Sequence, residues 1–197
     1  MREQLRNITD KPTKYGFVAV GSNLSTATRT SLQVAIEALG LFFDAEMRIT
    51  QQSQWYSAPA FPSGSGPDYV NGVVKVSTTL SAAQVLAALH GIENQLGRTR
   101  PARWASRIVD LDLLDFDGDV QPDAMVYKRW KTLPLEAQMR ETPEQLILPH
   151  PRLQDRSFVL KPLAEIAPDW QHPVMGLTAT ELLHLRPQDE RDEITPL

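Results

Sequence analysis

The hydrophobic residues of the first 116 positions follow two different spacings, which predict four strands and two helices. Apolar residues spaced three and four apart predict helices at 32–39, where Gly40 is a stop signal, and at 82–96, between an N-cap at Ser81 and a stop at Gly97. Short runs rich in β-branched and aromatic residues predict strands at 17–20, 47–56, 69–79 and 108–116. The order β-α-β-β-α-β favours an α+β domain of the ferredoxin-like type, with helices packed on one face of an antiparallel sheet.

Beyond position 116 the periodicity weakens. Residues 117–119 read as a turn, 124–143 form a polar stretch without a clear period, and 158–166 return to a helical pattern. We expect an N-terminal extension at 1–14, one domain at 15–186 with a C-terminal elaboration of the ferredoxin-like unit, and a charged, flexible tail at 187–197.

Composition excludes several classes of protein. The 197 residues are 42% hydrophobic and 22% charged, which is enough for one compact domain with a real core. We expect no membrane partner, because no apolar run approaches the roughly 20 residues that span a bilayer. The polar N-terminus lacks the apolar region of a signal peptide, and the absence of cysteine excludes disulfides and thiolate metal sites. These features fit a cytoplasmic protein, and the net charge of −4 argues against a general nucleic-acid binder.

The segment with the most chemical information combines four arginines with two aspartates. Asp110 and Asp112 are two positions apart in a predicted strand, so both carboxylates lie on one face, opposite Leu111 and Leu113. Neighbouring carboxylates repel each other unless a cation lies between them, and Mg²⁺ favours such oxygen ligands together with substrate phosphates. A guanidinium group can bind two phosphate oxygens at once through two parallel hydrogen bonds. Metal and guanidinium groups together suit nucleoside triphosphate chemistry. The arginines are Arg98, Arg100, Arg103 and Arg107.

Each part of this pattern also has a plainer interpretation. Two aspartates in a strand are common on protein surfaces, and arginine clusters are typical of solvated faces or of patches for acidic partners. The chain lacks the glycine-rich phosphate loop G-x-x-x-x-G-K-[ST], so a phosphate site here would have another design. The run 21–23, Gly-Ser-Asn, is more typical of a simple turn than of a ligand contact.

Residues 103–114, with the sequence RWASRIVDLDLL, resemble the signature of the 6-hydroxymethyl-7,8-dihydropterin pyrophosphokinase family. Further similarities occur in the family's order, from about residue 15 to residue 170. They are VGSNL at 20–24, PDYVN at 67–71, IE at 92–93 before LGR at 96–98, LPHPR at 148–152 and RSFVL at 156–160.

The resemblance implies a folate-synthesis enzyme that transfers pyrophosphate from ATP to the hydroxymethyl group of the pterin and releases AMP. Two Mg²⁺ ions would bind Asp110 and Asp112, and Arg98 and Arg107 would stabilise the transferred charge. The remaining roles follow the same resemblance. ATP would contact Glu93, Arg100, Arg103, Leu113, His150 and Arg156, and the pterin would contact Ala58, Pro59, Tyr69, Asn71, Trp104 and Phe158. Without the resemblance, the three aromatic residues would be assigned to core packing and His150 to a structural role.

The sequence departs from the family pattern in three places. Ala105 and Ser106 replace a usual Gly-Pro, and Ala58 replaces a usual threonine beside the pterin. The connection 115–148 is also longer than usual, which predicts an insertion near 123–143 that acts as a flap or an interface element.

Two other function classes remain open from the sequence. A ferredoxin-like sheet with arginine-rich loops could bind single-stranded RNA, although Asp110 and Asp112 would then face phosphates without a metal. A catalytically silent relative would keep the fold and bind ATP or pterin without turnover. The sequence is compatible with a monomer or a weak homodimer.

Overall fold

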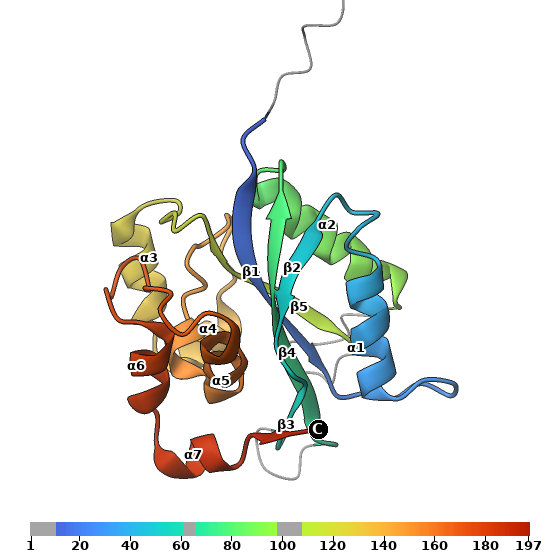
Figure 1. The fold of residues 1–197 in the computed structure, drawn as a ribbon. Coiled ribbons are helices and arrows are strands. Elements are labelled where there is room, and N and C mark those ends of the chain that lie inside the picture. Colours follow the sequence, from blue (N-terminus) through green and yellow to red (C-terminus); the bar gives the residue numbers. More distant parts are fainter. Residues whose placement is uncertain (1–10, 61–65, 98–107) are drawn as a thin grey trace, which may run out of the picture.

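An antiparallel sheet of six strands crosses the middle of the molecule in the computed structural model, which describes residues 11–60, 66–97 and 108–197 (Figure 1). Five strands lie in the order β5-β1-β4-β3-β6, and β2 pairs with β4 as well. The split β-α-β arrangement of the ferredoxin-like fold is therefore confirmed. The strands are β1 (Lys14–Ser22), β2 (Arg48–Gln52), β3 (Tyr56–Ala58), β4 (Tyr69–Thr78), β5 (Asp110–Phe116) and β6 (Thr195–Pro196).

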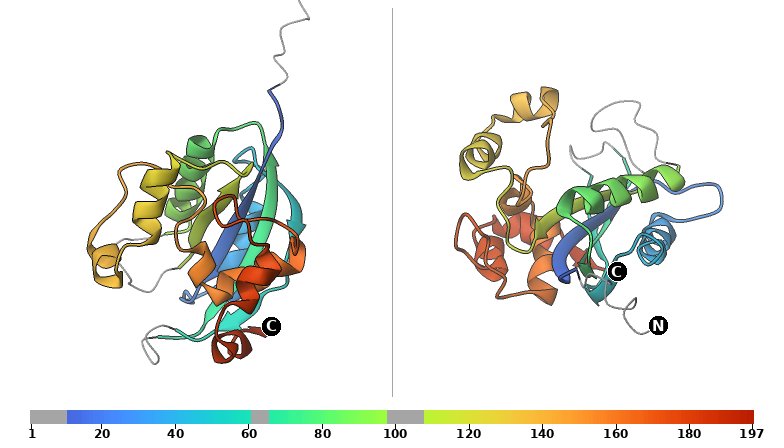
Figure 2. Two further views of the ribbon diagram at one scale, coloured as in Figure 1. Left: turned by 90° about the vertical axis from the view of Figure 1, so that its left-hand side faces the viewer. Right: turned by 90° about the horizontal axis from the view of Figure 1, so that it is seen from above.

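Helices cover both faces of this sheet, so the molecule has three layers (Figure 2). One face packs against α1 (Ser31–Gly40) and α2 (Ala82–Gln95), the two helices of the ferredoxin-like unit. The opposite face packs against α5 (Ser157–Ile166) and α6 (Ala179–His184). The C-terminal elaboration therefore forms the third layer, and the expectation of helices on one face holds for the first 116 residues alone.

Alternation along β1 explains how one strand serves two cores. Val18 and Val20 lie in the core under α1 and α2, whereas Phe17 and Ala19 lie in the core under α5 and α6. Because successive side chains of a strand point to opposite faces, a nearly continuous apolar run is what a sheet covered on both sides requires.

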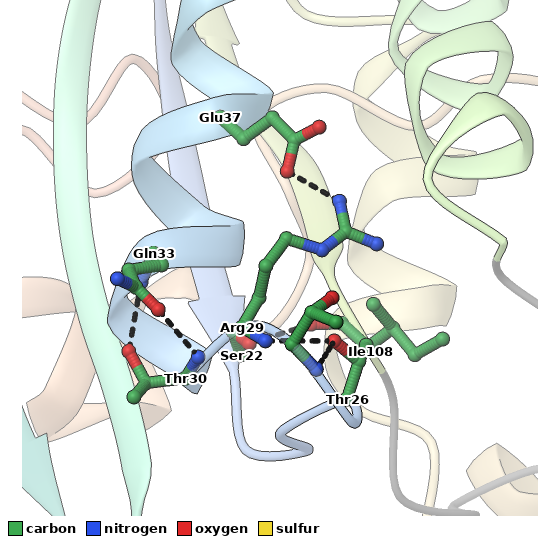
Figure 3. Close-up of polar contacts among 8 residues, drawn as sticks. Ser22, Thr26, Arg29, Thr30, Gln33, Glu37 and Ile108 are labelled. Carbon is green, nitrogen blue, oxygen red and sulfur yellow. Dashed lines mark hydrogen bonds and ion pairs between the residues drawn. The ribbon is translucent and has the colours of Figure 1, made fainter.

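The helices of the first layer begin at capping boxes. Thr30 accepts a hydrogen bond from the Gln33 backbone N–H, and the Gln33 side chain accepts one from the Thr30 N–H (Figure 3). Ser81 and Gln84 make the same reciprocal pair at α2, which confirms Ser81 as the predicted N-cap. Each box satisfies two N–H groups that the first helical turn leaves unpaired.

Two sequence-based boundaries need correction. Gly21 and Ser22 continue β1 instead of forming a turn, because both pair with β4. The strand predicted at 47–56 is divided into β2 and β3, with Ser53 between them donating its backbone N–H to the Val73 carbonyl.

The polar stretch expected as an insertion forms two short helices, α3 (Ala124–Lys131) and α4 (Leu135–Arg140). Asp123 caps α3 by accepting hydrogen bonds from the N–H groups of Met125 and Val126. These helices lie on the same side of the sheet as the C-terminal layer (Figure 2). Helix α3 left no apolar stripe for a periodicity analysis, because Tyr127 is its one buried residue.

The C-terminal residues 187–197 are not the loose tail that their charge predicts. They form α7 (Gln188–Asp192) and β6, and β6 pairs with β3 at the edge of the sheet (Figure 1). Ile194 is buried against Tyr56 and Ala58, and Lys161 donates a hydrogen bond from Nζ to the Arg191 carbonyl at 3.0 Å. The segment is held by a buried isoleucine and by backbone pairing, which outweigh its polar composition.

No helix among the described residues is long and apolar enough to cross a bilayer.

Candidate active site

At one end of the sheet, polar side chains of β4 and β5 lie on the face that α5 and α6 cover, and we call this region the polar end of the sheet. Strand register places Asp110 of β5 opposite Gly21 of β1, and Gly21 opposite Asn71 of β4, so the three residues form one row on one face. A methyl group built at Gly21 would lie 3.6 Å from Asn71 Oδ1. Glycine therefore leaves the space between the carboxylate and the amide uncovered.

Asp112 occupies the next row on the same face and binds a guanidinium. Arg156 donates from Nη1 to Asp112 Oδ2 at 2.9 Å, and both side chains are partly buried. Arg156 comes directly before Ser157, the first residue of α5, so the start of this helix fixes the backbone from which Arg156 reaches Asp112. The predicted placement of Asp110 and Asp112 opposite the buried Leu111 and Leu113 agrees with the structure.

His150 lies next to this pair and is neutral near pH 7. Burial, together with the positive charge of Arg156, lowers the pKa of His150 to about 4. Nδ1 accepts a hydrogen bond from the Arg152 backbone N–H at 3.2 Å, so the ring proton is on Nε2. The His150 backbone N–H donates to the Leu114 carbonyl at 2.7 Å, which ties the histidine to β5. This side chain offers a hydrogen-bond donor and no charge.

Arg152 is a residue that the sequence analysis did not assign to the site. Burial and the neighbouring Arg156 lower the pKa of Arg152, whereas the negative charges of Asp155 and Asp112 raise it. The guanidinium therefore lies within the electrostatic reach of the same carboxylate that Arg156 binds. Its position in the Pro-His-Pro-Arg run beside His150 was the only signal in the sequence.

The residues predicted to contact the pterin form a second group on the same face. Asn71 is buried and donates from Nδ2 to the Tyr69 carbonyl at 3.3 Å, and register places Tyr69 opposite Ala58. Phe158, in the first turn of α5, is 38% exposed although it is a large apolar side chain. The Arg156 guanidinium lies 5.8 Å from the centre of the Phe158 ring. A partly exposed aromatic ring on α5 and a buried amide on β4, two elements that pack against each other, suit a flat, polar-edged ring better than a closed core does.

Ala58 and Pro59 differ in how they could contribute. The Ala58 side chain is buried against Ile194, whereas Pro59 is exposed at the end of β3. A ligand contact at Ala58 would therefore involve the backbone.

Two predicted residues lie beneath the opposite face. Leu113 is buried in the core under α1 and α2, so a ligand would have to contact its backbone. Glu93 of α2 is also buried there, and its Oε1 accepts the backbone N–H of Leu111 at 2.8 Å. The structure therefore does not bring either side chain to the face that carries Asp110 and Asp112.

Five predicted residues lie outside the described parts of the chain. They are Arg98, Arg100, Arg103, Trp104 and Arg107. The described residues on either side, Gly97 and Ile108, mark where this segment leaves α2 and enters β5. Ser22 donates from Oγ to the Ile108 carbonyl at 2.5 Å, which ties the end of β1 to the first described residue after this segment (Figure 3).

The chemistry of the donors suits a hard cation shared with a ligand. Within the described residues no group of three or more His, Cys, Asp or Glu side chains gathers closely enough to hold a metal. Two carboxylates on one strand face, without a closed cage, fit Mg²⁺, which in phosphate sites uses one or two carboxylates and completes its shell with phosphate oxygens and water.

Comparisons with known proteins agree on one family. The family model described as 7,8-dihydro-6-hydroxymethylpterin-pyrophosphokinase (HPPK) matches residues 17–168. The chain is 37% identical over 166 residues to the 2-amino-4-hydroxy-6-hydroxymethyldihydropteridine pyrophosphokinase of Synechocystis, covering 84% of this chain and 73% of that protein. It is 34% identical over 153 residues to the enzyme of the same name from Haemophilus influenzae, covering 78% and 81%.

A solved structure matches the whole fold. The Plasmodium falciparum HPPK-DHPS triple mutant superposes with a TM-score of 0.66 at 15% identity, over 96% of this chain and 48% of that one. The chain thus spans about half the length of that longer protein, and the match extends through the C-terminal layer.

Proposed function

The chain belongs to the 7,8-dihydro-6-hydroxymethylpterin-pyrophosphokinase family and transfers pyrophosphate from ATP to 6-hydroxymethyl-7,8-dihydropterin in folate biosynthesis, and we propose that it does so on the polar end of the sheet. The observation that supports this location best is the row Asp110–Gly21–Asn71. Gly21 has no side chain, so its backbone forms an open floor of the site between a carboxylate and an amide. Adjacent strands are about 4.8 Å apart, so the two side chains begin roughly 10 Å from each other. That span suits a pterin whose hydroxymethyl group reaches a bound triphosphate.

Asp110 and Asp112 are the proposed metal ligands. With Mg²⁺ bound, as two ions in our proposal, the site would supply a more acidic pterin hydroxyl and neutralisation of the ATP phosphates. The protein's own part is to hold both carboxylates on one face of β5, where alternation with Leu111 and Leu113 fixes their direction.

The ATP side is proposed to consist of Arg156, His150 and the arginines of residues 98–107. Arg156 contributes a charge that phosphate oxygens can share with Asp112. Neutral His150 donates a hydrogen bond from Nε2, so it can bind an oxygen of the nucleotide at any pH well above 4. Arg98 and Arg107 would stabilise the charge that moves from ATP to the acceptor, and Arg100 and Arg103 would hold the phosphates.

The pterin side is proposed to use the amide of Asn71 and the faces of two aromatic rings. Asn71 reads the donor and acceptor edge of the ring system, and Tyr69 and Phe158 stack on its faces. Trp104 would close over the site, and Ala58 and Pro59 would form its rim. In-line attack of the hydroxymethyl oxygen on the β-phosphorus forms the new P–O bond, breaks the bond to the α-phosphate and releases AMP.

The first experiment measures AMP formation by the purified protein with ATP, Mg²⁺ and the pterin. Asp112→Asn is the matched variant, because it keeps the shape of the side chain and removes the charge. We expect pterin-dependent AMP in the wild type and a loss on the order of 10³-fold in the variant. Full activity in Asp112→Asn would show that the site is elsewhere. ATP binding without turnover would favour a catalytically silent relative, and RNA binding without Mg²⁺-dependent ATP binding would favour the nucleic-acid module.

Two further features stay predictions: the cytoplasmic location, which cell fractionation tests, and the oligomeric state, monomer or weak homodimer, which light scattering tests.

A further inference from the structure

A buried tyrosine links the inserted helix α3 to the segment that carries His150 and Arg156. Tyr127 is fully buried although its neighbours Lys128 and Arg129 are exposed. Its hydroxyl lies 3.1 Å from His172 Nε2 and 3.5 Å from Gln154 Oε1. Tyr127 is thus the one buried residue of α3, and its side chain enters a polar cluster between two distant parts of the chain.

The direction of these hydrogen bonds follows from His172. Its Nδ1 accepts hydrogen bonds from the backbone N–H groups of Val174 at 3.2 Å and Met175 at 3.3 Å, so the proton is on Nε2. Nε2–H therefore donates to the Tyr127 oxygen, and the tyrosine hydroxyl donates to Gln154 Oε1. Burial lowers the pKa of His172 to about 4 and raises the pKa of Tyr127 to about 12, so both stay neutral around pH 7.

Gln154 is the centre of the 150–156 turn, which contains the 3₁₀ helix η1 (Leu153–Asp155). Its Nε2 donates to the Pro151 carbonyl and to Asp155 Oδ2, each at 2.9 Å. The side-chain oxygen of Gln154 faces Tyr127, and the side-chain nitrogen holds the two ends of the turn together. The Gln154 side chain thus adds to the backbone hydrogen bonds that close the turn, from Leu153 N–H to the His150 carbonyl and from Arg156 N–H to the Leu153 carbonyl, and the Tyr127 hydroxyl contacts the Gln154 oxygen.

The same turn presents the ATP-side residues to β5. Arg156 follows Gln154 by two positions and reaches Asp112, and His150 begins the turn with its backbone bond to Leu114. We propose that Tyr127 is a positioning residue which, through Gln154, fixes the 150–156 turn for ATP binding, so that the inserted helix α3 serves as a brace for the nucleotide side. This proposal rests on the proposed site, because it assigns Arg156 and His150 to ATP.

The brace predicts a larger effect on ATP than on the pterin. Asn71 and Tyr69 of the pterin side lie on β4, and Phe158 alone of that side follows the 150–156 turn, in the first turn of α5. Loss of the Tyr127 hydroxyl should therefore weaken ATP binding about 3- to 10-fold, the range for one buried hydrogen bond, and weaken pterin binding clearly less. A purely structural tyrosine would lower the melting temperature without separating the two substrates.

The test compares dissociation constants for the non-hydrolysable analogue α,β-methylene-ATP, with Mg²⁺, and for the pterin. Tyr127→Phe keeps the ring and removes the hydroxyl. Tyr56→Phe is the matched control, because Tyr56 is also a buried tyrosine and its hydroxyl donates to Glu165 at 2.9 Å, near the end of α5 and not within the 150–156 turn. We expect weaker analogue binding in Tyr127→Phe and unchanged analogue binding in Tyr56→Phe, even if both variants melt earlier.

A double-mutant cycle with Gln154→Leu tests the route. If Tyr127 acts through Gln154, the double variant should bind the analogue about as weakly as Gln154→Leu alone. Additive losses would overturn the route, and unchanged analogue affinity in Tyr127→Phe would overturn the brace. Asp112→Asn, run in parallel, separates the two levels: if it also leaves the metal-dependent analogue affinity unchanged, the proposed site itself is wrong.

Discussion

The two faces of the sheet are filled in different ways. The face under α1 and α2 is apolar from Val18 and Val76 to Leu111 and Leu113, whereas the face under α5 and α6 is apolar around Phe17 and polar around Asp110 and Asn71. Strand β5 contributes to both, with two leucines on one side and two aspartates on the other. The comparison indicates that the closed face stabilises the fold, and that the open end of the other face can carry charge because it has no core to build.

Asp112→Asn should give the largest effect on the polar face. Turnover should fall on the order of 10³-fold, because a charge that faces the transferred group is lost. Stability should change by less than about 1 kcal/mol, since the Asp112–Arg156 pair is partly exposed and screened by solvent. Initial rates of AMP release and a thermal melt measure the two quantities, and a large loss of stability would contradict the division between the faces.

Leu111→Ala tests the other side of the same strand, one residue away. Leu111 is buried, so the truncation should cost about 2–5 kcal/mol of unfolding free energy through lost burial and a cavity. The fraction that remains folded at low temperature should keep its turnover within about threefold of the wild type. Urea unfolding and turnover rates per folded molecule provide the check. A specific loss of turnover in stably folded Leu111→Ala would contradict the assignment of Leu111 to stability alone.

Two glycines of β1 test the same difference between the stabilising part and the polar end of the sheet. A methyl group at Gly16 would meet Phe116 Cδ2 at 2.9 Å and the Asp115 carbonyl at 3.0 Å, so Gly16→Ala should destabilise the protein by about 1–3 kcal/mol. At Gly21 the nearest atom is Asn71 Oδ1 at 3.6 Å, so Gly21→Ala fits the fold but covers the floor between Asp110 and Asn71. We expect Gly21→Ala to raise the KM for pterin roughly 10-fold, about 1.4 kcal/mol, with little change in melting temperature. A loss of stability in Gly21→Ala with an unchanged KM for pterin, and the reverse in Gly16→Ala, would refute the proposed floor.

The smallest expected effect concerns pH. Burial raises the pKa of Asp115 to about 6, so the folded state binds this proton more tightly than the unfolded state does. This group therefore adds stability below its unfolded pKa, and that contribution is lost as the pH rises through about 6. His150 and His172 have lowered pKa values of about 4, so they act in the opposite direction and cost stability as the pH falls from about 6.5 to 4.

Asp115→Asn isolates the carboxyl from the two histidines. Between pH 6 and pH 4 the variant should lose roughly 1–2 kcal/mol more stability than the wild type, because the compensating protonation of Asp115 is absent. Urea unfolding at several pH values measures this slope. Parallel curves for the two proteins would mean that Asp115 keeps an ordinary pKa.

Strong periodicity explains which parts of the fold were predictable. The stripe on α2 and the alternation along β4 gave these elements to within about a residue, and the Ser81 capping signal marked a true helix start. Helix α7 escaped because its side chains are all polar, and α3 escaped because Tyr127 is its one buried residue, so its placement depends on tertiary contacts such as Tyr127 with His172. Residues 187–197 looked loose because a single buried residue, Ile194, leaves no periodic trace.

The site was predictable where spacing within one strand decides geometry. Asp110 and Asp112 had to share a face, and the structure agrees. The row that joins Asp110 to Gly21 and Asn71 depends on the register of three strands, which no local pattern contains. The contact of Arg156 with Asp112 joins positions 44 residues apart, and a family resemblance could suggest it but composition and spacing could not.

The most direct test of the polar face as the catalytic site is a crystal structure with Mn²⁺ in place of Mg²⁺, α,β-methylene-ATP and the pterin, with anomalous data collected at the manganese edge. We predict manganese peaks within about 2.5 Å of the Asp110 and Asp112 carboxylates. We also predict that the pterin will lie between Phe158 and Tyr69, with its polar edge on Asn71. Manganese and analogue bound at another surface, with Asp110 and Asp112 left facing solvent, would contradict the account.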